Sequence, residues 1–137
     1  MLGGKKLTNI ELMNYWIESS DDDYKTMKNL YNSKDYSWCL FVGHLVIERL
    51  IKAICAKNNP DNPHAIKSHD LLLLADKYDI ELDDDKKDKL DLISTFNLNA
   101  RYEDYKREFY KKCTKEYADE QIKNIEEMRT WLKAQLT

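Results

Sequence analysis

The chain of 137 residues is long enough for one domain with a buried core and too short for two. Only 3 Gly and 2 Pro interrupt it, which excludes turn-rich sandwiches and barrels and favours a few long helices. The formal net charge of -3 excludes a polycationic protein, so any contact with nucleic acid has to come from a local patch. These numbers predict a single all-α domain.

The cysteines and the chain start indicate the cellular compartment. Three widely spaced cysteines without a Cys-x-x-Cys pair exclude a disulfide framework and a zinc ribbon: Cys39, Cys55 and Cys113. No apolar segment follows the lysines of residues 1–6, so no signal peptide is predicted. The longest apolar run, residues 38–47, is too short to span a bilayer. We expect a soluble, cytoplasmic protein.

The first predicted helix begins after Thr8 and runs to about Asn32. The Thr8 hydroxyl and the Glu11 carboxylate form a capping box, and apolar residues then recur at helical spacing. Residues 19–23 are poor helix formers, which favour a kink or break at this point.

The second predicted helix opens near residues 33–35 and ends near Lys57. Residues 38–47 are apolar nearly all round, and a helix with that pattern is buried on more than one side. This predicts a central position, a subunit interface, or both. Gly43 is unfavourable inside a helix, which suggests close approach of another backbone there.

A loop and a short helix follow. Residues 58–63 are rich in turn formers and contain both prolines, so they predict a loop. Ser68 or Asp70 then caps a short helix from Leu71 to Tyr78.

The last part of the chain predicts two more helices. The acidic run 83–85 starts a fourth helix, because carboxylates are favourable at a helix N-terminus. The helical pattern falters over residues 97–104, which predicts a bend or turn, and the last helix carries its apolar residues between 117 and 136. We therefore predict four long helices plus one short helix in one domain, residues 1–137, with residues 1–7 as a flexible extension.

Two histidines lie near polar or acidic residues in the sequence and are candidates for a metal-binding or catalytic role. His44 and Glu48 are four residues apart and share one face of the second helix. Two such side chains do not make a metal site, so we expect a buried polar pair satisfied by a partner side chain. His69 lies between Ser68 and Asp70, where a helix start explains the sequence; a catalytic role for His69 is the alternative.

A basic and aromatic segment begins where the fourth helix ends. Arg101 lies at the break in the helical pattern, where functional side chains are often presented. Arginine binds phosphate bidentately, and tyrosine rings stack on bases. Residues 101–115 hold six basic and three acidic side chains, interleaved with four aromatic rings, which is typical of RNA binding. The alternative is that the lysines form the solvated face of a helix.

No other motif signals catalysis. The chain has no Gly-rich phosphate loop, no nucleophile elbow and no recognisable Cys–His pair. We expect no metal and no cofactor.

Four segments carry a family resemblance. They are an N-terminal helix with Trp16 and Asp22 or Asp23, a second helix from Tyr36 to Ala53 with His44 and Glu48, then His69-Asp70-Leu71, and then Asn99-Ala100-Arg101-Tyr102. In this order and spacing they resemble the HEPN family of small helical-bundle proteins. The resemblance covers nearly the whole chain.

The resemblance implies an up-and-down helical bundle that is often a homodimer. It also implies a minimal nucleotidyltransferase as partner, with which family members are commonly encoded as toxin–antitoxin modules. Many members are metal-independent endoribonucleases in which an Arg is followed four to six residues later by a His. Arg101 matches this Arg, but Lys106, Arg107 and Glu108 occupy the positions where the His would fall. Without an imidazole there, the usual acid–base chemistry lacks its group.

These observations lead to a binding module rather than a self-contained enzyme. We expect a partner of a nucleotidyltransferase-type protein in a toxin–antitoxin-like system, or a module that binds RNA or nucleotide. The candidate binding residues are Arg101, Tyr102, Tyr105, Lys106 and Arg107.

Two other interpretations remain open. The chain is an active metal-independent ribonuclease if Arg101 clamps the phosphate and His44 or His69 replaces the missing His. In a purely structural interpretation, Arg101 pairs with Glu48 inside a polar cluster. The members of that cluster would be His44, Glu48, Asn99 and Arg101.

Overall fold

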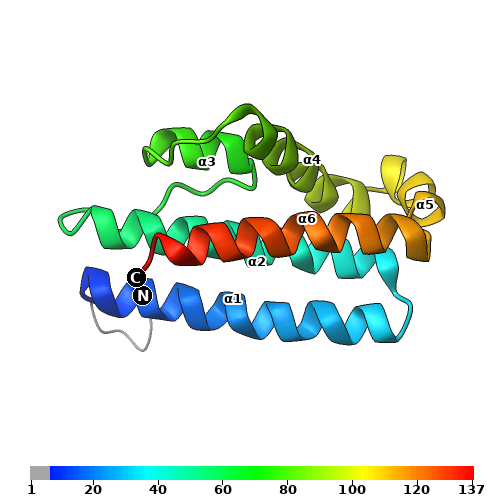
Figure 1. Ribbon diagram of the computed structural model, residues 1–137, viewed down its shortest axis with the longest axis horizontal. Helices are drawn as coiled ribbons and strands as arrows, with labels where there is room; N and C mark the ends of the chain where they lie inside the picture. Colours follow the sequence, from blue (N-terminus) through cyan, green and yellow to red (C-terminus); the bar gives the residue numbers. More distant parts are fainter. Residues whose placement is uncertain (1–6) are drawn as a thin grey trace.

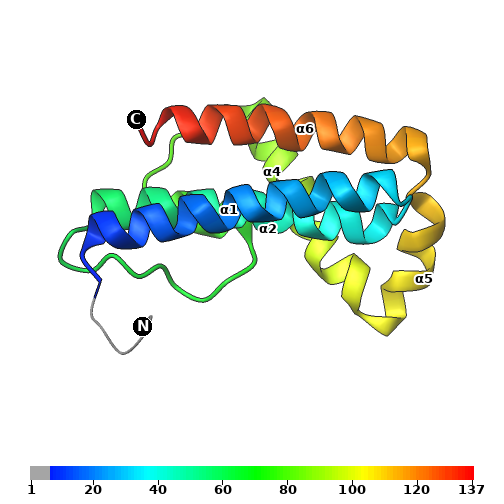
Figure 2. The same cartoon turned by 90° about the horizontal axis from the view of Figure 1, so that it is seen from below.

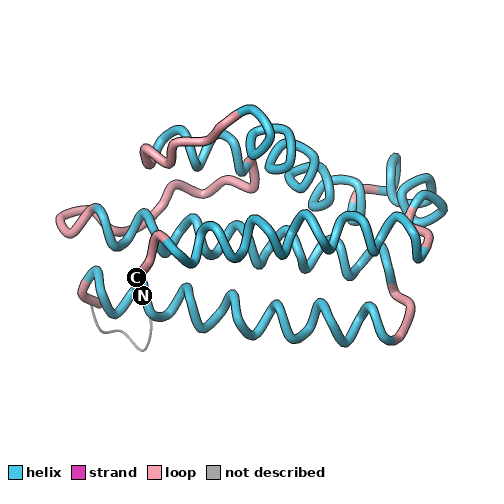
Figure 3. Tube along the Cα trace, viewed as in Figure 1, coloured by secondary structure: helices cyan, strands magenta, loops and turns pink. Residues whose placement is uncertain are grey.

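The computed structural model describes residues 7–137, which form six helices and no strand (Figures 1 and 3). The helices are α1 (Asn9–Asn32), α2 (Tyr36–Asn58), α3 (Leu71–Lys77), α4 (Asp84–Arg101), α5 (Glu103–Lys112) and α6 (Lys115–Ala134). The predicted all-α fold is confirmed. The extension predicted to be flexible, residues 1–7, lies outside the described residues except for Leu7.

The four long helices alternate in direction along the chain, as in an up-and-down bundle. In Figure 1, α1 and α4 run one way, whereas α2 and α6 run the other. The short α3 lies beside α4, and α5 caps the end of the bundle near the start of α2. None of the helices within residues 7–137 is long and apolar enough to cross a membrane.

Helix α5 is an element that the sequence patterns did not separate from the last helix. The predicted break is real: Tyr102 has an extended backbone, with φ -82° and ψ 134°, and ends α4. The chain turns helical again at Glu103, buries Phe109, and stops at Cys113. Thr114 then caps α6 by accepting a hydrogen bond from the amide of Tyr117. An N-cap threonine is therefore the sequence signal that divides α5 from α6.

Helix α1 is continuous through its weakest stretch, so no break occurs at residues 19–23. These short polar side chains bind the neighbouring helices. The Ser20 hydroxyl is buried and donates to the carbonyl of Val46, with 2.7 Å between the oxygens. Asp21 pairs with Arg129 at 3.1 Å and with Lys133 at 2.8 Å on α6. Interhelical contacts outweigh the low helix propensity of these residues.

Helix α2 is the centre of the bundle and contacts the five other helices. Its all-round apolar pattern is explained by this central position within one chain. Gly43 lies where the neighbouring helices approach most closely. A Cβ atom there would lie 2.5 Å from Cδ1 of Ile125 on α6 and 3.2 Å from Sδ of Met27 on α1. The close approach expected at Gly43 is thus made by two side chains rather than by another backbone.

The three cysteines are free, buried thiols in the same core. Burial raises the pKa of Cys39 to about 12 and, likewise, that of Cys113 to about 12; burial also raises the pKa of Cys55. The Cys39 thiol donates to the carbonyl of Met27, at 3.3 Å. These cysteines act as small apolar residues of the core.

Candidate functional site

A buried carboxylate on α2 organises the candidate site. Glu48 is 3% exposed and accepts hydrogen bonds from Nδ1 of His69, at 2.7 Å, and from Nζ of Lys52, at 3.1 Å. One turn earlier, Nε2 of His44 donates to the backbone carbonyl of His69, at 2.9 Å. Nε2 of His44 lies 3.9 Å from Oε1 of Glu48, so the two side chains of the predicted polar pair are neighbours. Its partner is His69, which α2 holds by both ring and backbone.

These contacts determine the protonation states of Glu48 and His44. Burial alone would raise the pKa of Glu48, but the hydrogen bond from His69 and the charge of Lys52 outweigh it, so the pKa is lowered. Burial lowers the pKa of His44, which is therefore neutral. Because a carbonyl only accepts, the His44 proton is on Nε2, and its buried Nδ1 has no partner within the described residues. Those residues contain no group of three or more His, Cys, Asp and Glu side chains that could hold a metal ion.

The start of α3 holds His69 in place from the other side. Asp70 caps α3 by accepting from the amide of Leu73, at 3.2 Å, while the Ser68 hydroxyl accepts from the amide of Asp70, at 3.1 Å. Of the two candidate caps, Asp70 is therefore the one used, and Ser68 binds the amide of this cap residue. The amide of Leu71 donates to Oγ of Ser94 on α4, at 2.9 Å. The His69 side chain remains 59% exposed, with Nδ1 bound to Glu48.

Arg101 is the last residue of α4 and is not paired with Glu48. Its Nε and Nη2 donate to Oδ1 of Asn97, one turn earlier on the same helix. Its guanidinium lies 5.8 Å from the ring centre of Phe41 and 5.5 Å from that of Tyr102. The predicted Glu48–Arg101 ion pair is wrong, because His69 and Lys52 already satisfy the Glu48 carboxylate.

One surface cavity brings His69 and Arg101 together. Its volume is about 350 Å³, and it lies between the start of α3 and the end of α4. It is lined by His69, Asp70, Asp91, Ser94, Thr95, Asn97, Leu98, Arg101 and Tyr102. His44 is buried behind this cavity and does not line it. Of the two histidines proposed as substitutes, only His69 presents its ring beside Arg101.

The other residues of the predicted binding segment divide between two sides of α5. Lys106 and Arg107 line a cavity with Trp38 of α2. Tyr105 lies elsewhere, in a depression with Asn99 and the acidic side chains Asp104 and Glu108. Asn99 is therefore not part of the polar cluster predicted around His44, Glu48 and Arg101. Consecutive residues of α5 point in different directions around the helix axis, because a turn takes 3.6 residues, and this places Tyr105 on another side than Lys106 and Arg107.

Sequence reasoning did not find Trp38, Tyr110 or Asn97 as site residues. Trp38 seemed to belong to the core, yet it lies in the first turn of α2 and is 45% exposed. Asn97 is buried and orients Arg101. Its position one turn before Arg101 is the signal that could have revealed it.

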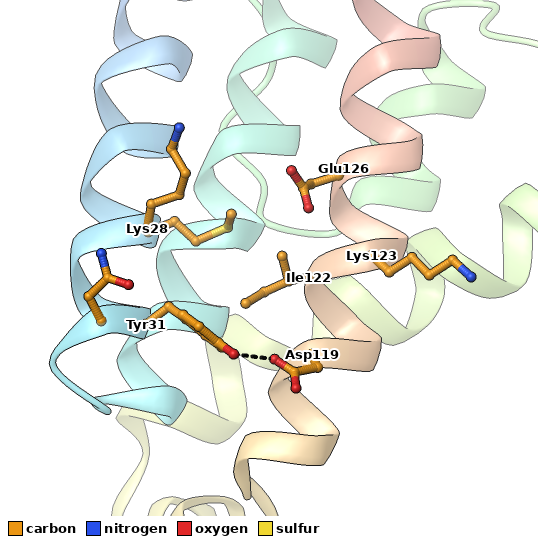
Figure 4. A pocket seen from close by; sticks show the side chains of 8 residues that line it. Lys28, Tyr31, Asp119, Ile122, Lys123 and Glu126 are labelled. Carbon is orange, nitrogen blue, oxygen red and sulfur yellow. Dashed lines mark hydrogen bonds between the residues drawn. The ribbon is translucent and has the colours of Figure 1, made fainter.

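A further cavity of about 380 Å³ separates α1 from α6 (Figure 4). Met27 and Ile122 line it, and the hydroxyl of Tyr31 donates to Asp119 across its edge. It contains none of the predicted site residues. The carboxylate of Asp119 also accepts from Lys115, at 3.0 Å, so its hydrogen-bonding capacity is largely used within the fold.

The contacts of Glu48 and His44 should make the free energy of unfolding depend on pH. Because the folded pKa of Glu48 lies below its ordinary value, its contribution to folding is complete above about pH 4.5 and is lost as pH falls through the folded pKa. Glu48→Gln should lower the free energy of unfolding by about 1.5–3 kcal/mol near neutral pH, the value of hydrogen bonds to a charged group. The difference in the free energy of unfolding between wild type and Glu48→Gln should become smaller in acid. His44 adds a separate loss below about pH 6.5 in both proteins.

Urea unfolding followed by circular dichroism at several pH values measures this difference. Glu81→Gln, at an exposed residue between α3 and α4, is the matched control and should change little. A difference that stays constant from neutral pH to about pH 3 would contradict the ionised state of Glu48.

Comparison with known proteins agrees with this architecture. The crystal structure of the protein TT1696 from Thermus thermophilus is similar, with a TM-score of 0.76 and 15% identity over 90% of this chain and 97% of that chain. At this identity the likeness shows the fold. No curated protein matches. The HEPN domain, by contrast, matches residues 13–135. Because that match spans most of the six-helix structure, the chain belongs to the HEPN domain family.

Proposed function

We propose that this HEPN-domain chain is a binding module that holds a phosphate group of RNA or of a nucleotide between Arg101 and His69. One observation carries the proposal: a guanidinium and an exposed imidazole from separate segments line the same cavity. Both groups donate N–H bonds when a phosphate is bound, provided that the imidazole is protonated on Nε2 as well.

The guanidinium of Arg101 is oriented before a ligand arrives. Asn97 accepts from Nε and Nη2, which leaves the Nη1 amino group for a phosphate oxygen. The ring of Tyr102 is 52% exposed next to it, and a base can stack there.

The carboxylates in this cavity favour a nucleotide over a bare phosphate ion. Asp70 and Asp91 line the same cavity as Arg101, and they repel an anion that occupies all of it. A carboxylate instead accepts hydrogen bonds from hydroxyl groups, and ribose supplies these beside its phosphate. The mixture of one guanidinium with acidic acceptors therefore suits a ribonucleotide unit.

Binding of a fluorescein-labelled single-stranded RNA, measured by anisotropy, tests the proposal. Arg101→Ala should weaken binding about tenfold and lower the salt dependence by roughly one phosphate contact. Lys87→Ala, which removes an exposed charge at the other end of α4, is the matched control and should change binding little. An Arg101→Ala protein that binds RNA normally but unfolds more easily would mean that Arg101 is structural.

A second candidate function is metal-independent RNA cleavage, favoured by the Glu48–His69 contact. A buried carboxylate that accepts from Nδ1 of His69 leaves Nε2 free to take a proton. In such a reaction Nε2 removes the proton of a 2′-hydroxyl, O2′ attacks the adjacent phosphorus, and the P–O5′ bond breaks. The products are a 2′,3′-cyclic phosphate and a 5′-hydroxyl that regains the proton from His69. Arg101 would stabilise the charge on the phosphate oxygens.

Incubation of labelled RNA in EDTA separates cleavage from binding. If the chain is a ribonuclease, wild type should produce cyclic-phosphate ends, and His69→Ala should reduce the rate at least about 100-fold. His64→Ala, at an exposed histidine in the same loop, should cleave like wild type. RNA that stays intact with folded wild-type protein argues for binding alone.

For protein partners, we propose a homodimer and a nucleotidyltransferase-type partner in a toxin–antitoxin-like system, both on the basis of the family resemblance. The central position of α2 now accounts for most of its apolar residues, so this pattern no longer argues for a dimer by itself. Three aliphatic or phenyl side chains in the first half of α2 remain half-buried, and this stripe supports a contact with a second copy: Phe41, Val42 and Leu45.

Light scattering at micromolar concentration tests both assemblies. We expect wild type to have the mass of a dimer, and Leu45→Glu to be monomeric because the charge opposes burial of the stripe. Addition of a nucleotidyltransferase encoded beside this chain should raise the mass further. Lys25→Glu, on the exposed face of α1, is the control that should leave the mass unchanged. A monomeric wild type contradicts the dimer.

A further inference from the structure

A second cavity lies between the start of α2 and α5. These two elements lie together at one end of the bundle (Figures 1 and 2). Its volume is about 210 Å³. The residues that line it are Ser37, Trp38, Ala100, Lys106, Arg107 and Tyr110. No acidic side chain is among them, in contrast to the cavity with His69.

Two large aromatic rings border this cavity and are left in solvent. Tyr110 is 71% exposed and Trp38 is 45% exposed. Trp38 meets Phe41 edge to face, with ring centres 5.6 Å apart at 88°, so the indole orientation is fixed by packing. Exposed rings of this kind beside positive charges are the platforms on which proteins stack bases of single strands.

A hydroxyl group lies in the wall of the cavity. Ser37 is only 8% exposed, and it lines the cavity. A serine hydroxyl can donate to a phosphate oxygen. Ser37 also lies in the first turn of α2, where the N-cap residue Asp35 makes no side-chain hydrogen bond to the helix. Its carboxylate accepts from the Ser33 hydroxyl instead, at 2.6 Å.

The charges around this hydroxyl suit an anion. The first amides of α2 have no capping acceptor from a side chain, so the positive end of the helix dipole is open beside Ser37. Arg107 forms no ion pair in the part of the chain that the structure describes. Lys106 pairs with Glu103 at 3.3 Å, but this exposed pair is easily exchanged for a stronger anion.

We infer that this cavity is a second subsite for single-stranded RNA, which takes a phosphate at Ser37 and Arg107 and a base against Trp38 and Tyr110. The inference rests on the proposed function and deepens it. The two cavities are joined by side chains, since Phe41 contacts both Trp38 and the guanidinium of Arg101. A strand of at least two nucleotides occupies both, with one phosphate at Arg101 and a neighbouring nucleotide in the second cavity.

A protein partner is the other class of ligand for such a surface, because Trp, Tyr and Arg also dominate protein interfaces. Three features favour RNA: the Ser37 hydroxyl in the cavity wall, the open N-terminus of α2, and the absence of acidic side chains from the lining. The small volume accommodates a phosphate, while a base stacks on the rings at its rim.

Anisotropy titrations of the full chain with a short fluorescein-labelled oligoadenylate RNA test the subsite. Tyr110→Ala and Arg107→Gln should each weaken binding about tenfold, through loss of stacking and of a phosphate contact. Ser37→Ala should weaken it severalfold. The matched control is Lys111→Gln, which removes an exposed charge of α5 outside this cavity and should stay within roughly twofold of wild type.

Competition with 5′-AMP and with adenosine separates the phosphate from the base. We expect AMP to displace the RNA at high concentration and adenosine to do so less well, with Ser37→Ala and Arg107→Gln removing that difference. AMP binding by a protein that does not bind RNA would overturn the assignment to an RNA strand.

The outcomes distinguish this inference from the proposed function. If Arg101→Ala weakens RNA binding while Tyr110→Ala and Arg107→Gln do not, the subsite is wrong and the proposed function stands. If Lys111→Gln weakens binding as much as the cavity variants do, binding is a general charge effect and the subsite is also wrong. If wild type binds neither RNA nor AMP, both are wrong.

Discussion

A charged carboxylate that is buried in the middle of a helix destabilises the fold unless nearby groups compensate for its lost hydration. Glu48 imposes this requirement at the centre of the bundle, and the compensation comes from Lys52 on its own helix and from His69 on the segment before α3. His44 strengthens the same connection through the backbone of His69. The long loop after α2 is therefore tied to the core at its end, although it has no regular structure of its own (Figure 3).

This connection has a consequence for the surface. His69 is held on α2 and Leu71 is bonded to Ser94 on α4, and the imidazole lines the same cavity as Arg101 at the end of α4. Arg101 in turn is fixed by Asn97 and rests near the rings of Phe41 and Tyr102. The break at Tyr102 turns α5 back toward the start of α2, so that basic side chains of α5 join Trp38. A charge in the core and a break in a helix together shape one continuous polar and aromatic surface.

The sequence predicted most helix boundaries because short polar residues mark them: Thr8, Asp70 and Asp83 each cap a helix through the side chain. It missed α5 because ten residues with one buried side chain give too little apolar periodicity to separate from the next helix. The pair of His44 and Glu48 was predictable from its spacing, since a helix places such residues on one face. The His69 contact to Glu48 and the exposure of Trp38 depend on how distant segments pack, and local spacing carries no information about that. The wrong Glu48–Arg101 pair has the same origin.

The buried thiols make the cohesion of this fold observable at one end of the bundle. Cys39 lies in the first turn of α2, whereas Cys113 lies at the junction of α5 and α6, and burial raises the pKa of both thiols to about 12, which leaves almost no thiolate at neutral pH. A thiol-reactive reagent can therefore modify either one only while its surroundings are open. Helix α5 has Phe109 as its buried residue, so its junction with α6 opens more readily than α2, whose buried residues run along most of its length. The modification rate at Cys113 thus reports the loosening of α5, and the rate at Cys39 reports the opening of the start of α2.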